Sequence, residues 1–159
     1  MKKKYIILSV TVGVVLLLDQ ISKIYVASVM TLNESAVVIS GFFNITHVRN
    51  PGAAFGFLAD SSPVFRSAFF IIIALVAIVL ILVLVVKIKD RELLLIFSLS
   101  LILSGAVGNF LDRIRLGEVV DFLDFYILSY HWPAFNMADS AITVGAMVLI
   151  YEIVGKKTT

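Results

Sequence analysis

The sequence predicts a mainly α-helical membrane protein in which four helices cross the bilayer and residues 1–159 form a single domain. The chain is 60% hydrophobic and 15% charged, with a mean hydropathy of +1.06, whereas a soluble domain is about 25% charged. It contains four apolar runs, each long enough to supply the roughly 20 residues that cross a bilayer. Basic residues gather in short clusters near the ends of these runs, which is typical of membrane spans.

The first span is expected from Tyr5 to Ala27, after the lysines at positions 2–4. A cleavable signal peptide has the same order of basic and apolar residues. The apolar pattern continues past Leu18, however, which favours a retained span. Asp19 and Lys23 are four residues apart, so they share one helix face and can form an ion pair.

The helical pattern is interrupted between residues 28 and 62. Two runs, Ala36–Ile39 and Phe42–Val48, are rich in β-branched and aromatic residues, and the turn signal Ser40-Gly41 separates them. This pattern predicts a β-hairpin. The next stretch, Asn50–Gly56, reads NPGAAFG, and its small residues suit either a simple turn or a close approach of the backbone to another group.

Three further spans are expected in the rest of the chain. Ser62 and Pro63 predict a helix start, with serine as the N-cap and proline as the first helical residue. The second span is then expected from Val64 to Val86, the third from Leu93 to Phe110 and the fourth from Phe135 to Val154. Residues between the last two spans are polar and rich in aromatic side chains, as at a membrane interface.

The basic residues predict the orientation of these spans. The two termini and the loop between the second and third spans contain eight lysines and arginines, against four on the opposite side. Because basic residues are enriched in cytoplasmic loops, both termini are expected to face the cytoplasm. Residues 28–62 and 111–134 then share the outer side, so the acidic residues among them lie at the outer membrane boundary.

Composition excludes several kinds of site. The chain has no cysteine, so disulfides and thiolate nucleophiles are excluded, and its two histidines form no zinc-binding motif, so neither a metal nor another cofactor is expected. A net charge of +2 gives no indication of nucleic-acid binding. A serine–histidine site at Ser104 is disfavoured because both histidines are expected on the outer loops.

Acidic residues between Gly105 and Asp139 remain as candidates, and ionisable groups beside hydrocarbon each cost a few kcal/mol or more. Two carboxyl groups that share one proton can hydrolyse a peptide bond, since one takes a proton from water while the other polarises the carbonyl. Spacing leaves Asp112, Asp121 and Asp124 as alternative partners for Asp139. A purely structural pairing of these acids with the arginines at positions 113 and 115 is the other interpretation.

The sequence resembles the lipoprotein signal peptidases, also called signal peptidase II, a family of aspartic peptidases of bacterial membranes. The resemblance covers nearly the whole chain and rests on separate blocks in the family's order, which are Asp19–Lys23, Asn50–Gly56, Gly108–Arg113, Val119–Phe122 and Phe135–Asp139. Each block alone is a weak signal, but their order and separations together are highly specific.

The resemblance implies a fold of four transmembrane helices with a small extracytoplasmic β-sheet cradle. It implies an aspartic endopeptidase of the bacterial cytoplasmic membrane, which cleaves the signal peptide of a prolipoprotein just before a cysteine that carries diacylglycerol. Membrane lipids and the inhibitor globomycin are further expected partners, and a monomer is expected. By this resemblance the catalytic pair is Asp121 and Asp139, the substrate contacts are Asn50, Asn109, Arg113 and Asn136, and the structural residues are Asp112, beside Arg113 or nearby backbone, with Asp19 and Lys23 behind the site.

Two other classes of function are considered. A small ion-coupled transporter would place its acids near the midplane and often has an inverted repeat, neither of which the sequence indicates. A non-catalytic scaffold would need neither Asp121 nor Asp139, so substitution of these two residues distinguishes it from an enzyme.

Overall fold

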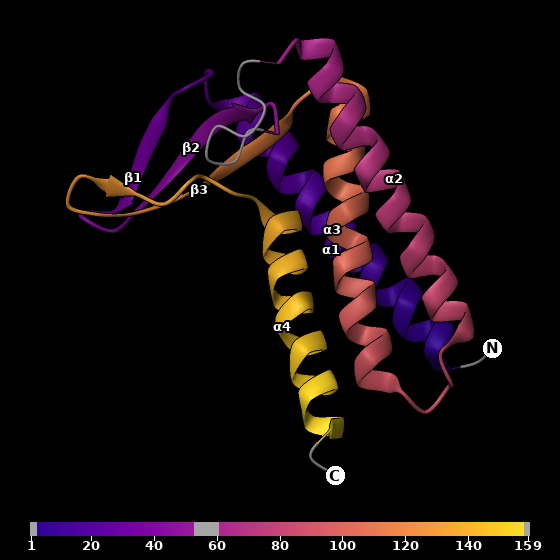
Figure 1. Cartoon of the computed structure of the whole chain (residues 1–159). Helices are drawn as coiled ribbons and strands as arrows, with labels where there is room; N and C mark the ends of the chain where they lie inside the picture. The colour runs from indigo at the N-terminus through magenta and orange to yellow at the C-terminus, as the bar shows by residue number, and fades with distance from the viewer. Residues whose placement is uncertain (1–2, 53–60, 158–159) are drawn as a thin grey trace.

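A computed structural model describes residues 3–52 and 61–157 as four long helices with an antiparallel sheet at one end (Figure 1). The predicted fold class, four apolar helices with a small sheet, is confirmed. Both termini lie at the end of the helix bundle away from the sheet (Figure 1). The elements are α1 (Lys3–Val29), β1 (Ser35–Ile39), β2 (Phe43–Asn50), α2 (Pro63–Lys87), α3 (Leu93–Leu116), β3 (Val119–Ile127), β4 (Tyr130–His131) and α4 (Met137–Lys157).

All four helices are long and apolar enough to cross a membrane. The start of α2 is as predicted, since Pro63 is its first residue and the Ser62 hydroxyl accepts the Phe65 N–H at 3.3 Å. Two predicted ends were wrong. α3 continues beyond Phe110 to Leu116, and α4 begins at Met137 instead of Phe135.

α3 is the central helix of the bundle and contacts the other three. Its close approach to α1 and α4 depends on two glycines. A Cβ at Gly105 would collide with the carbonyl oxygen of Ala138 on α4, and a Cβ at Gly108 would meet the carboxylate of Asp19 on α1. On the α2 side, an apolar core forms around the buried side chains of Ile81, Val85, Leu99 and Leu103.

Lys4, at the start of α1, caps the C-terminal end of α2. Its side chain is 4% exposed, and its ammonium donates to the carbonyls of Val85, Val86 and Ile88 at 3.2, 3.0 and 2.9 Å. It also lies 3.5 Å from a carboxylate oxygen of Asp90. The last carbonyls of a helix have no partners within the helix and carry partial negative charge. Lys4 therefore ties α1 to α2 at the end of the bundle opposite the sheet.

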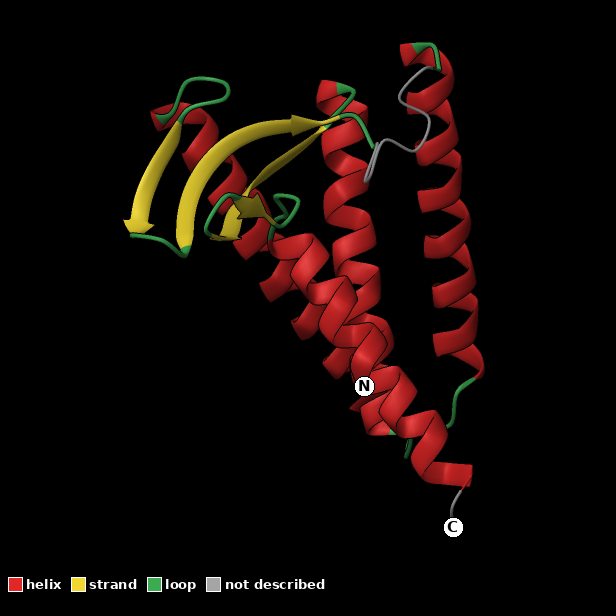
Figure 2. Ribbon diagram, turned by 60° about the vertical axis from the view of Figure 1, so that its left-hand side comes forward, coloured by secondary structure: helices red, strands yellow, loops and turns green. Residues whose placement is uncertain are grey.

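The sheet has the strand order β1-β2-β3-β4, and it curves over the end of the bundle (Figure 2). β1 and β2 form the predicted hairpin. β3 lies where the residue pattern predicted only an interfacial segment. It follows α3 directly, because Gly117 ends that helix with a φ of 76°, a conformation that glycine adopts without strain. The sheet is thereby joined to the centre of the bundle.

The small-residue segment after β2 is described only in part. Gly52 has a φ of 102°, and a Cβ at this position would collide with the Phe70 ring of α2. This agrees with the predicted close approach of the backbone. Positions 53–56 of the same motif lie outside the described residues.

Candidate active site

Asp121 lies on β3 with its side chain 2% exposed and both carboxylate oxygens hydrogen-bonded to asparagine amides. Oδ1 accepts from Asn136 Nδ2 at 2.7 Å, and Oδ2 accepts from Asn50 Nδ2 at 2.8 Å. Asn50 ends β2, and its own Oδ1 accepts the Gly52 N–H at 2.8 Å. The turn after β2 therefore fixes the amide that binds Asp121.

Asp139 lies in the first turn of α4 and takes part in the capping of that helix. Its N–H donates to the side-chain oxygen of Asn136 at 2.9 Å, and its carboxylate accepts the Asn136 backbone N–H at 3.3 Å. This reciprocal pattern is a capping box. The other carboxylate oxygen accepts from Asn109 Nδ2 on α3 at 2.7 Å.

Backbone pairing brings Asn136 to Asp121. The segment before α4 forms a bridge with β3, in which Leu123 and Phe135 exchange hydrogen bonds of 2.8 and 3.1 Å. Asn136 follows this bridge, is 0% exposed and contacts both Asp121 and the N–H of Asp139. One asparagine therefore connects the two acids.

Lys23 lies behind this pair, with its side chain 2% exposed. Its ammonium is 2.9 Å from Asp19, 2.9 Å from Asp112 and 3.0 Å from Asn109 Oδ1. The predicted Asp19–Lys23 pair is confirmed. Asp112 also accepts the Val120 N–H at 3.3 Å. Of the two partners expected for it, Arg113 or nearby backbone, the structure has the backbone, and it adds Lys23.

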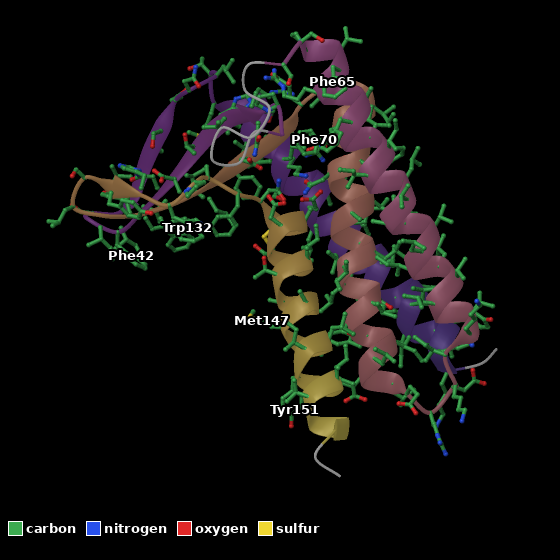
Figure 3. All side chains as sticks on the ribbon, in the orientation of Figure 1. Phe42, Phe65, Phe70, Trp132, Met147 and Tyr151 are labelled. Atoms are coloured by element: carbon green, nitrogen blue, oxygen red, sulfur yellow. The ribbon has the colours of Figure 1, made fainter. Side chains whose placement is uncertain are left out.

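Arg113 is held by contacts other than an acid pair. Its guanidinium lies 5.2 Å from the centre of the Phe70 ring and donates to the backbone carbonyl of Asn109 at 3.3 Å. Phe70 is contributed by α2 at the sheet end of the bundle (Figure 3). The arginine is thus placed close to the acids, and its predicted contact with substrate stays a prediction.

Asp124 lies on the same strand as Asp121 but has different neighbours. Its carboxylate accepts from Asn44 Nδ2 at 2.9 Å and lies 2.8 Å from Nδ1 of His131. Of the three acids that spacing left open, Asp121 is the one that lines a cavity together with Asp139.

That cavity has a volume of about 460 Å³ and opens between the sheet and the start of α4. A second cavity of about 410 Å³ lies along the first turns of α4 and shares Trp132, Phe135 and Asp139 with the first cavity. Trp132 lies below the sheet on the side of α4 (Figure 3). The residue pattern indicated a membrane interface for the aromatic residues of this segment, which include Trp132, and did not predict that Trp132 lines a cavity with the acids. The described lining of the first cavity is Val48, Arg49, Asn50, Pro51, Asp121, Trp132, Pro133, Ala134, Phe135 and Asp139.

Burial of Asp121, together with the nearby charge of Asp139, raises the pKa of the Asp121 carboxyl to about 7. The hydrogen bonds from Asn50 and Asn136 and the charge of Lys23 act in the opposite direction. A carboxyl group with such a pKa can hold a proton near neutral pH and release it during a reaction.

Comparison with known proteins shows the family to which the chain belongs. Residues 11–155 match the family described as signal peptidase (SPase) II. A lipoprotein signal peptidase of Syntrophus aciditrophicus is 54% identical over 99% of this chain and 98% of its own, and one of Geobacter sulfurreducens is 49% identical over 97% and 95%. A bacterial membrane enzyme structure determined by the in meso method at 2.3 Å resolution superposes with a TM-score of 0.84, at 35% identity over 94% of this chain and 88% of that one.

Four apolar helices, a sheet over one end and these matches define a multi-pass membrane peptidase. Within that class, the chain belongs to the signal peptidase II family, the lipoprotein signal peptidases.

Proposed function

We propose that this protein is an aspartic endopeptidase that removes the signal peptide of diacylglyceryl-modified prolipoproteins immediately before the lipidated cysteine. Asp121 and Asp139 are the catalytic pair. The observation that carries the proposal is their joint position, since Asn136 contacts both residues and both line one cavity. The names of the relatives support the class of substrate.

In the proposed reaction the ionised Asp139 takes a proton from a water molecule, which attacks the scissile carbonyl. Asp121 donates its proton to the carbonyl oxygen, which gives a tetrahedral gem-diol. Asp139 then passes the proton it took from water to the leaving nitrogen, the C–N bond breaks, and a hydroxyl of the gem-diol returns a proton to Asp121, so the acid pair is restored. Two observations support this assignment. The pKa of Asp121 is raised to about 7, and Asp139 lies in the first turn of α4, where the partial positive charge of a helix N-terminus favours an anion.

The reaction as proposed needs no metal ion. Both histidines are engaged elsewhere, since His47 Nδ1 lies 3.0 Å from the Met30 carbonyl and His131 lies beside Asp124. The chain has no cysteine. The two acids and the water between them supply every proton transfer of the mechanism.

The position of the second cavity suits a substrate that is itself embedded in the lipid bilayer. It extends from Asp139 past Ser140 and Thr143 to Val144, along the outside of α4. A bilayer would surround that face, because Val144 and Met147 of α4 are 45% and 57% exposed. A lipid-linked peptide could therefore reach the acids from the side of the membrane without first entering water. Globomycin-type inhibitors are expected to bind the same cavities, and the enzyme is expected to act as a monomer.

Asparagine variants of the three acids test the proposal. The purified protein is incubated with a diacylglyceryl-modified prolipoprotein, and the released signal peptide is measured. Asp121→Asn and Asp139→Asn should each lower turnover by on the order of 10³-fold or more, and the double variant should be little worse, since the two act as a unit. Asp124→Asn is the matched control, because Asp124 contacts Asn44 and His131 instead of the pair.

The control also decides between aspartates. If Asp124→Asn is inactive and Asp121→Asn is active, Asp124 and not Asp121 is the catalytic aspartate of β3. Globomycin binding should persist in at least one single variant, because the replacement keeps the shape of the site. A protein that cleaves normally after both substitutions would not be an aspartic peptidase of this kind.

A further inference from the structure

A third cavity lies beside Lys23, between α1, the end of α3 and the sheet, and shares Arg49 with the first cavity. It has a volume of about 250 Å³. We call it the rear cavity and define it by six of its lining residues, which are Gln20, Lys23, Ile24, Arg49, Arg115 and Leu116. The proposed reaction uses none of its space.

The rear cavity has more hydrogen-bond donors than acceptors. The guanidinium of Arg115 donates to Gln20 Oε1 at 3.2 Å, which engages one of its N–H groups. Within the described part of the chain, the half-buried guanidinium of Arg49 has no hydrogen-bond or ion-pair partner. Each guanidinium carries five N–H donors in a planar arrangement that matches phosphate or carboxylate oxygens.

The acidic residue in the rear cavity offers little to a cation. Both oxygens of Asp112 are already engaged, one by Gln20 Nε2 at 3.2 Å and the other by Lys23 at 2.9 Å and the Val120 N–H at 3.3 Å. The same Gln20 amide also donates to Asp19 at 3.1 Å, so its oxygen is turned toward Arg115. The network thus holds an arginine in place while leaving most of its donors unused.

The walls of the rear cavity lead onto an apolar helix face. Ile24 and Leu116 line it, and Ile21, Ile24 and Tyr25 of α1 are 62%, 54% and 65% exposed. This part of α1 belongs to an apolar helix long enough to span a membrane, at the end nearest the sheet. At the end of a membrane-spanning helix the lipid headgroups lie nearby, and the hydrocarbon chains lie along the helix.

We propose that the rear cavity binds the phosphate of a glycerophospholipid through Arg49 and Arg115, with the lipid's hydrocarbon chains lying along α1. A phosphodiester supplies the acceptors that the two guanidiniums lack. Its chains cover the exposed apolar side chains of α1. A free inorganic phosphate could use the same arginines but would leave that apolar face uncovered.

Native mass spectrometry of the full-length protein in detergent tests this site. Dioleoyl phosphatidylglycerol is titrated and the dissociation constant of the first bound lipid is measured, with dioleoylglycerol as the ligand that lacks phosphate. Phosphatidylglycerol should bind about tenfold or more tightly than dioleoylglycerol, as expected for charge-assisted hydrogen bonds. Equal binding of the two would show that the phosphate is not recognised.

The variant Arg115→Gln carries the test, since Arg115 is exposed at the end of α3 and the fold does not depend on its burial. It should weaken phosphatidylglycerol binding about tenfold, and Arg115→Gln with Arg49→Gln should abolish the preference over dioleoylglycerol. Arg91→Gln is the matched control at the other end of the bundle and should bind as the unchanged protein does. An equal loss in Arg91→Gln would attribute the binding to overall charge. Displacement of the lipid by an equal concentration of inorganic phosphate would assign the site to the free ion and overturn the lipid proposal.

Discussion

The amide side chains around Asp121 and Asp139 are oriented by groups that can only donate hydrogen bonds. The ammonium of Lys23 contacts Asn109 Oδ1 at 3.0 Å, so the Asn109 amide nitrogen is turned to Asp139. In the same way, the Asp139 N–H contacts Asn136 Oδ1 at 2.9 Å, which turns the Asn136 nitrogen to Asp121. Neither ammonium nor backbone N–H can accept a hydrogen bond. Both carboxylates therefore face N–H donors, and the site can hold negative charge without a metal.

The protonation of Asp121 predicts how activity depends on pH. Asp121 must carry a proton to donate it, and its pKa is raised to about 7. The rate constant kcat/KM should therefore fall as the pH rises through about 7, where the proton is lost. The apparent pKa belongs to the coupled pair and not to one residue. The measurement is cleavage of a lipidated prolipoprotein between about pH 5 and pH 9.

Asp124→Asn is the control for this profile and should leave the alkaline limb in place, because Asp124 is paired with His131. A rate that stays constant up to about pH 9 would mean that the proton of Asp121 is not used. A limb that disappears in Asp124→Asn would transfer the titration to the Asp124–His131 pair.

Residue spacing alone could not decide whether Asp121 or Asp124 is the partner of Asp139. Read as a helix, residues three apart lie on one face, so spacing could not separate them. The segment is the strand β3, in which an odd separation places side chains on opposite faces. Asp121 accordingly contacts Asn136, whereas Asp124 contacts Asn44. The resemblance to the family selected the acid that lies beside Asp139, although the residue pattern did not predict the strand.

At the scale of the elements, α1 and α4 are joined by a buried carboxylate. Asp19 of α1 is 0% exposed and accepts the Ala138 N–H at the start of α4 at 2.9 Å, besides its pair with Lys23. Asp19→Ala leaves the Ala138 N–H without its acceptor and removes one of the two carboxylates beside the Lys23 ammonium, which keeps Asp112 and Asn109. A buried donor without a partner costs about 1–3 kcal/mol. We expect a lower melting temperature in detergent, and a smaller loss in turnover per folded molecule.

Thermal unfolding and active-site titration of the same Asp19→Ala preparation separate these effects. An unchanged melting curve with abolished turnover would place Asp19 in the chemistry. Glu34→Ala is a suitable control, because Glu34 is exposed and its carboxylate accepts hydrogen bonds from Thr31 of its own turn, away from the Asp19 network.

The contact between α3 and α4 predicts a second effect on stability. A Cβ at Gly105 would collide with the Ala138 carbonyl oxygen, and backbone cannot move aside as a side chain can. Gly105→Ala should destabilise the protein by about 1–3 kcal/mol, as overpacking does. Because Ala138 precedes Asp139, the shift should also lower activity. Gly13→Ala in α1 is the matched control, since a Cβ there meets nothing within 4 Å. Equal melting temperatures for the two variants would contradict the packing argument.

Hydropathy predicted the four spans, because an apolar run of sufficient length has few alternatives to a membrane helix. It misplaced the end of α3 and the start of α4, both at the sheet end of the bundle, for a physical reason. The polar residues after Phe110 appeared to end the third span, yet Asp112 is buried and paired with Lys23, and α3 continues to Leu116. α4 starts at Met137 because Asn136 caps it. A distant partner, Lys23, allows α3 to continue, and a local side-chain cap starts α4. Local hydropathy contains neither effect.

At the scale of the whole molecule, the two ends of the bundle differ. The sheet, the acid pair and the rear cavity lie at one end, whereas both termini and the loop between α2 and α3 lie at the other (Figure 1). The termini and this loop contain eight of the lysines and arginines, against four toward the sheet. One of these lysines also has a structural role, since Lys4 caps α2. The distribution of basic residues predicts that the sheet end faces away from the cytoplasm.

Reporter fusions test that orientation. A reporter that is active only outside the cytoplasm should work when fused after Ser61, at the sheet end, and fail after Asp90, in the loop between α2 and α3. The reason is the positive-inside rule, under which the basic loops stay in the cytoplasm. A cytoplasm-specific reporter at the same two positions is the control and should give the opposite pattern. If the reporter is active after Asp90 and silent after Ser61, the acids face the cytoplasm, and cleavage of exported prolipoproteins by this site is excluded.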